Sequence, residues 1–214
     1  MEIKVCGMRE LANLEALLSQ VGPDWVGLIF YPKSPRFVSD SQADLIKKIS
    51  ANKVGVFVNE ELGVVLQKIE KFGLEAVQLH GSESIEYVED LKGKSEVKIW
   101  KVFPVGGEVD WESMAKYDGM VSRFLFDTAS KKHGGTGLKF DWSLLNGYPF
   151  KTPFMLGGGL DSESEEDLIE LASKSTRMIG VDLNSNFEIA PALKDLGKLR
   201  KFKSELHGLL AQKG

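Results

Sequence analysis

The chain has 214 residues, a formal net charge of −4, 43% hydrophobic residues and 27% charged residues. These globular proportions argue against a disordered or membrane-embedded protein, and the mild acidity lacks the basic surface that nucleic-acid binding requires. The length predicts one domain over residues 1–214 with a single hydrophobic core.

A single cysteine, Cys6, cannot form an internal disulfide, which is typical of proteins in a reducing compartment. No apolar run approaches the roughly 20 residues that a membrane-spanning helix needs. We therefore expect a cytoplasmic protein without a membrane partner.

Short apolar runs alternate with longer amphipathic stretches along the whole chain. The predicted strands are residues 2–6, 25–30, 53–58, 76–80, 97–103, 123–127, 153–157 and 177–183. The predicted helices are 9–21, 39–50, 60–72, 82–92, 109–117, 141–146, 163–174 and 195–211. Ser39 and Ser82 are predicted N-caps, and Gly73 is predicted to end the third helix.

Eight strand–helix units of about 25 residues each predict an α/β fold, a single-domain (β/α)8 TIM barrel. A doubly wound open sheet is the alternative. That fold usually has fewer strands and a glycine-rich turn after the first strand, where this chain has "CGMRE".

In such a barrel the functional site lies at the carboxyl ends of the strands. Lys4 and Cys6 should point the same way because side chains alternate along a strand. A nearby ammonium can lower the pKa of a thiol from about 8.5 toward neutrality, which would make Cys6 a base or a nucleophile. The alternative is a buried cysteine that only fills space.

Asp127 ends the apolar run "RFLFD". Partial burial there should raise its pKa and suit it to general-acid catalysis, whereas the alternative is a turn cap. A group ready to take a proton and another ready to give one together indicate an isomerase or a lyase.

Other strand ends carry candidate binding groups. The loops at 157–160 ("GGGL") and 182–185 ("DLNS") predict a phosphate site made by bare backbone N–H groups and a short following helix. Arg36 can bind a carboxylate or a phosphate, or can be a solvated surface arginine. His80 can orient a substrate or bond backbone groups. His80, His133 and His207 are too widely separated for a zinc site.

Several blocks resemble the phosphoribosylanthranilate isomerase family of tryptophan biosynthesis. They are "KVCGMRE", "GLIFYPKSPRFVS", "VGVFVN", "VQLHGSES", "FDTASKKHGGTGLKFDW", "LGGGL" and "GVDLNSNFEIAP", in that order along nearly the whole chain. The resemblance implies the Amadori rearrangement of N-(5′-phosphoribosyl)anthranilate, a phosphorylated small-molecule substrate, without a metal or redox cofactor. One departure is Ala192, where the family usually has glycine.

The resemblance also implies roles for individual residues. Cys6 matches the general base, Asp127 the general acid, and Arg36 the residue that contacts the anthranilate carboxylate. The remaining matches are His80 and Asp182 for substrate binding and Gly157, Gly158, Gly159, Asn184 and Ser185 for phosphate binding. Both a monomer and a homodimer fit this family.

The sequence is also compatible with two alternative functions. The histidine-pathway aminoaldose isomerase runs the same rearrangement on the same scaffold, but enzymes of that kind use an aspartate where this chain has Cys6. A non-catalytic phosphosugar-binding or thiol redox-sensing barrel would keep the fold and the ligand without isomerase activity.

Overall fold

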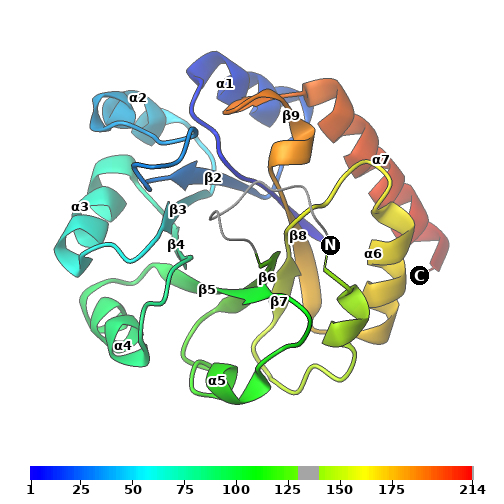
Figure 1. The fold of residues 1–214 in the computed structure, drawn as a ribbon. Helices are drawn as coiled ribbons and strands as arrows, with labels where there is room; N and C mark the ends of the chain where they lie inside the picture. The colour runs from blue at the N-terminus through cyan, green and yellow to red at the C-terminus, as the bar shows by residue number, and fades with distance from the viewer. Residues whose placement is uncertain (130–139, 214) are drawn as a thin grey trace.

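In the computed structural model, which describes residues 1–129 and 140–213, eight parallel strands close into a barrel in chain order (Figure 1). The barrel closes where β1 pairs with β8, and Lys4 lies opposite Asp182 in that pair. The predicted TIM barrel is therefore confirmed. The strands are β1 (Glu2–Val5), β2 (Trp25–Ile29), β3 (Lys53–Phe57), β4 (Ala76–Leu79), β5 (Lys98–Val105), β6 (Arg123–Thr128), β7 (Phe154–Leu156) and β8 (Met178–Leu183).

Helices surround the barrel and bury their apolar faces against it (Figure 1). They are α1 (Leu11–Gln20), α2 (Ala43–Lys48), α3 (Leu62–Phe72), α4 (Ile85–Lys94), α5 (Trp111–Ala115), α6 (Glu165–Lys174) and α7 (Leu196–Lys213). A short 3-10 turn, η1 (Asp40–Gln42), precedes α2. In the sixth unit the predicted helix 141–146 is instead a 3-10 turn, η2 (Trp142–Leu145).

The helix ends test the predicted caps. Ser39 accepts a hydrogen bond from the backbone N–H of Ser41, and Gly73 ends α3 with a φ of 63°, as predicted. The N-cap of α4 is Ser84, so the prediction of Ser82 is wrong. Ser82 instead donates through its backbone N–H and its hydroxyl to the side chain of Asn59.

Two apolar layers stabilise the barrel. One lies between the strands and the helices, and the other fills the barrel interior. At the amino end of the strands, Arg123 lies 4.4 Å from the centroid of the Trp100 ring and 2.6 Å from the carboxylate of Glu2. The interior layer closes the barrel beneath the carboxyl ends; its apolar members are Trp25, Val54, Ala76, Trp100, Val102, Leu125 and Met155.

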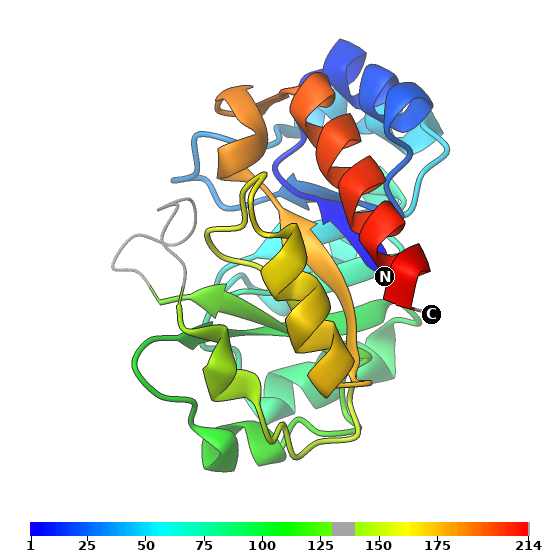
Figure 2. The same ribbon diagram turned by 90° about the vertical axis from the view of Figure 1, so that its right-hand side faces the viewer.

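After β8 the chain forms elements that the sequence pattern did not reveal. They are a 3-10 turn, η3 (Ser185–Phe187), and an antiparallel pair of short strands, β9 (Glu188–Ala190) and β10 (Leu193–Lys194). Figure 2 shows that this segment and the loops after β2 and β7 gather at one end of the barrel, whereas both chain termini lie at the other end. Within the described ranges, no helix combines the length and apolar character needed to cross a bilayer.

Candidate active site

Cys6 directly follows β1, where its backbone N–H donates to the carbonyl of Leu183 at 2.8 Å. Its side chain is buried, with 4% of its surface exposed. A Cβ atom on Gly27 of β2 would lie only 2.7 Å from the sulfur. The missing side chain at Gly27 therefore leaves the space that the thiol occupies.

Lys4 lies beneath Cys6, as the strand alternation predicted. Its ammonium is fully buried, lies 2.7 Å from Asp182 Oδ2, and also interacts with the thiol. The prediction that Lys4 gives the thiol a lowered pKa is nevertheless wrong. Burial and the Asp182 carboxylate raise the pKa of Cys6, and together they outweigh Lys4 and a second ammonium, that of Lys194.

Asp127 and His80 meet at the carboxyl ends of β6 and β4. Asp127 Oδ2 lies 3.4 Å from His80 Nε2, and both side chains are about one-fifth exposed, at 19% and 18%. The other oxygen of Asp127 accepts the backbone N–H of Thr128 at 2.8 Å. Asp127 thus faces another titratable side chain while part of its carboxylate remains open to a ligand.

Asp182 interacts both with Lys4, beneath Cys6, and with the Asp127–His80 pair. One of its oxygens holds Lys4 beneath Cys6, and its charge also interacts with Asp127 and His80. Its second oxygen, Oδ1, is buried and has no hydrogen-bond partner among the residues that the structure describes. A buried carboxylate oxygen without a partner is unfavourable, so this atom suits a hydroxyl group of a ligand.

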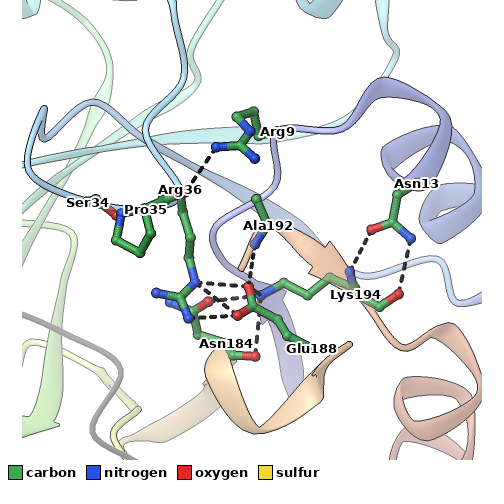
Figure 3. Close-up of polar contacts among 9 residues, drawn as sticks. All are labelled: Arg9, Asn13, Ser34, Pro35, Arg36, Asn184, Glu188, Ala192 and Lys194. Atoms are coloured by element: carbon green, nitrogen blue, oxygen red, sulfur yellow. Dashed lines mark hydrogen bonds and ion pairs between the residues drawn. The ribbon is translucent and has the colours of Figure 1, made fainter. Parts of the chain in front are cut away.

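Arg36, on the loop between β2 and α2, pairs with Glu188 (Figure 3). Its Nε lies 2.9 and 3.0 Å from the two carboxylate oxygens, and its Nη2 lies 2.6 Å from Oε2. Only 12% of the Arg36 side chain is exposed, so Arg36 is not a solvated surface arginine, and its binding of a ligand carboxylate or phosphate stays a prediction. The Nη1 group lies outside this pairing.

The glycine loop after β7 gives a mixed result. The N–H of Gly157 donates to the carbonyl of Phe126 at 2.7 Å, so the prediction of a bare N–H is wrong at this glycine. Gly158 and Gly159 adopt left-handed backbone angles, with φ of 74° and 73°. A Cβ on Gly158 would lie 2.5 Å from Asp127 Oδ1. Glycine is therefore required at this position, because a side chain would collide with the candidate acid.

The loop after β8 holds the other predicted phosphate residues. Asn184 accepts hydrogen bonds from Lys194 through its side chain and its carbonyl, and Ser185 opens the turn η3. Asn186, which the sequence did not single out, donates to the carbonyls of Gly159 and Leu160 at 3.1 and 3.0 Å. The two predicted phosphate loops are therefore joined directly.

The fold thus brings the predicted residues to one end of the barrel. Glu188 and Lys194 were missed because nothing in their local pattern marks a buried ion pair, although they follow the "DLNS" segment closely. Part of the predicted block "FDTASKKHGGTGLKFDW", including His133, lies outside the described residues.

Comparisons with known proteins identify the family of this chain. The family model described as N-(5'phosphoribosyl)anthranilate (PRA) isomerase matches residues 3–205. The chain belongs to the phosphoribosylanthranilate isomerase family. An N-(5'-phosphoribosyl)anthranilate isomerase of Phocaeicola vulgatus is 44% identical over 206 residues, which cover 96% of this chain and 98% of that protein.

Solved structures of phosphoribosylanthranilate isomerases share the fold. The Thermotoga maritima enzyme is 34% identical with a TM-score of 0.84, covering 97% of this chain and 99% of that one. Another structure of such an isomerase, 33% identical with a TM-score of 0.81 over the same shares, was determined in complex with reduced 1-(o-carboxyphenylamino)-1-deoxyribulose 5-phosphate.

Proposed function

We propose that this chain acts in tryptophan biosynthesis as a phosphoribosylanthranilate isomerase, which converts N-(5′-phosphoribosyl)anthranilate to 1-(2-carboxyphenylamino)-1-deoxyribulose 5-phosphate. The observation that carries the proposal is the placement of Cys6 and Asp127 at the carboxyl ends of β1 and β6 in one closed barrel, with Asp182 in electrostatic contact with both. The family match supplies the substrate. The catalytic unit is one domain, residues 1–214, in a cytoplasmic monomer or homodimer.

Asp127 is the proposed general acid. It donates a proton to the ring oxygen of the ribose as the bond from that oxygen to C1′ breaks, and the lone pair of the anthranilate nitrogen forms the Schiff base. His80, 3.4 Å from the carboxylate, keeps Asp127 oriented. A positioned proton transfer of this kind typically contributes about 10² to 10⁴ in rate.

Cys6 is the proposed general base. Its thiolate removes the proton from C2′, the electrons form the C1′–C2′ double bond of an enolamine, and tautomerisation gives the ketone. Burial keeps the thiol protonated in the free protein, because its pKa is raised. The positive charge of the Schiff base next to the sulfur favours the thiolate, as do the ammonium groups of Lys4 and Lys194. The thiol therefore releases its proton to solvent water when the intermediate forms, and the resulting thiolate then accepts the C2′ proton.

The remaining residues bind the substrate in this proposal. Arg36 offers Nη1 to the anthranilate carboxylate, and Asp182 Oδ1 accepts a ribose hydroxyl. The backbone of Gly158 and Gly159, together with Asn184 and Ser185, binds the phosphate. Holding the substrate at both ends aligns the sugar between acid and base. The proton transfers require no metal or redox cofactor.

The test is a direct activity assay. Phosphoribosylanthranilate generated in place by the preceding phosphoribosyl transfer loses its fluorescence as it is isomerised, and the purified chain is expected to accelerate that loss with saturation kinetics. A barrel that only binds phosphosugars or senses oxidants would leave the rate at the uncatalysed level, and that result would refute the proposal.

A further inference from the structure

Lys194 is a fully buried cation whose charge favours the Cys6 thiolate in the proposed chemistry, and its contacts on the other side have no role there yet. Its Nζ lies 2.7 Å from Glu188 Oε1, 2.8 Å from Asn184 Oδ1 and 3.3 Å from the Asn184 carbonyl (Figure 3). An ammonium has three N–H donors, so these acceptors use all of them. Burying a charge is unfavourable unless it is paired in this complete way. The ammonium therefore has a fixed position.

Glu188 lies between two cations. Its carboxylate accepts from Arg36 on one side, from Lys194 on the other, and from the backbone N–H of Ala192 at 3.1 Å. Only 4% of the side chain is exposed. Because the bonds use Nε and Nη2, Glu188 fixes the plane of the guanidinium and directs its Nη1 edge away from the pair.

The backbone that carries the pair is itself anchored. Asn13 of α1 accepts the backbone N–H of Lys194 at 2.8 Å and donates to its carbonyl at 3.1 Å. On the other side, Arg9 donates to the carbonyl of Pro35, immediately before Arg36. The loops after β1, β2 and β8 thus meet around one buried ion pair (Figure 3).

We propose that Glu188 and Lys194 are positioning residues: Glu188 aims Arg36 at the carboxylate of the substrate, and Lys194 ties that arginine to Asn184 at the phosphate end. The inference rests on the proposed function. Substitutions of Glu188 and of Lys194 should therefore weaken ligand binding in different ways. Loss of the Glu188 charge affects recognition of the carboxylate alone, whereas loss of Lys194 affects both ends of the ligand, because Lys194 also donates to Asn184.

The experiment uses two stable ligands, reduced 1-(o-carboxyphenylamino)-1-deoxyribulose 5-phosphate and the matching phenylamino compound without the carboxylate. The ratio of their dissociation constants measures carboxylate recognition. For Glu188→Gln this ratio is expected to fall about tenfold from the wild-type value, with the affinity for the compound that lacks the carboxylate unchanged. The double variant with Arg36→Met should have the same ratio as Arg36→Met alone. Lys194→Met should weaken binding of both ligands.

Glu2→Gln is the matched control, because it removes an arginine-paired carboxylate at the opposite end of the barrel, and its ratio should equal that of the wild type. If Glu188→Gln does not fold, Glu188→Asp, which keeps the charge but draws the guanidinium back, should lower the ratio in the same direction. Equal weakening of both ligands by the Glu188 variants would overturn the inference and leave only a structural role. Wild-type protein that binds neither ligand would instead refute the proposed function.

Discussion

Replacement of Gly7 by alanine should displace Arg36 while leaving the barrel intact. Gly7 follows Cys6 and has a φ of 78°. A Cβ at this position would lie 2.6 Å from Arg36 Cδ and 2.8 Å from Asn184 Oδ1. The new methyl group would therefore press on the residue proposed to bind the substrate carboxylate and on one proposed to bind its phosphate.

The expected loss of activity in Gly7→Ala can be worked out from these two distances. Carbon atoms pack at about 3.5 Å or more, so Arg36 Cδ must move by about 0.9 Å from its present 2.6 Å. A misplacement of about 1 Å at a binding group can lower the rate about 10²-fold. Left-handed backbone adds a cost of about 1–2 kcal/mol for alanine in place of glycine. We expect kcat/KM to fall by about two orders of magnitude, mainly through KM.

The assay measures kcat, KM and the free energy of unfolding in urea for Gly7→Ala and for Gly119→Ala. Gly119 is the matched control because its φ is 75° and nothing lies within 4 Å of its Cβ position. It therefore carries the same backbone strain without the collision. Gly7→Ala should lose at least as much stability as Gly119→Ala, and only Gly7→Ala should lose activity. Wild-type KM in Gly7→Ala, or an equal loss of activity in Gly119→Ala, would show that the collision with Arg36 does not impair substrate binding.

Three further predictions concern the same end of the barrel. Ala192 has a φ of 70°, so Ala192→Gly should raise the free energy of unfolding in urea by up to about 1 kcal/mol, and a decrease would contradict this. Because burial raises the pKa of Cys6, its alkylation by iodoacetamide should be slow at pH 7, and the alkylation rate should rise about tenfold between pH 7 and pH 8. An alkylation rate that is already constant at pH 7 would indicate a thiolate and contradict this. Burial alone would raise the pKa of Glu188, but Arg36 and Lys194 hold that pKa below its ordinary value. The ionised Glu188 carboxylate therefore stabilises the fold above about pH 4.3, and this stabilisation is lost as the pH falls through the pKa of the folded state. The difference in unfolding free energy between wild type and Glu188→Gln should therefore shrink as the pH is lowered from 7 to 3. A difference that stays constant over this range would contradict the prediction.

The barrel was predictable because each unit repeats one apolar run and one amphipathic run. That regularity also placed Cys6, His80 and Asp127 correctly at strand ends, and side-chain alternation placed Lys4 beneath Cys6. Elements with too few residues to show a period were not predictable. The strands β9 and β10 have three and two residues, and both Glu188 and Lys194 lie in them.

The wrong predictions for the pKa of Cys6 and for the N–H of Gly157 share a physical cause. The sequence shows that Lys4 is near Cys6, but the sign of the pKa shift depends on how completely the thiol is buried and on Asp182, a residue 176 positions away along the chain. Similarly, three consecutive glycines suggest free N–H groups, yet the N–H of Gly157 already donates to the carbonyl of Phe126 in β6. Tertiary contacts determine both outcomes.

In the proposed mechanism, Cys6 and Asp127 transfer protons to and from one bound sugar. Single-turnover rates and affinities for the reduced product analogue should be measured together for wild type, Cys6→Ala and Asp127→Asn. Each variant is expected to bind the analogue about as well as wild type but to isomerise at least about 10²-fold more slowly. A variant that keeps the wild-type rate would remove that residue from the mechanism.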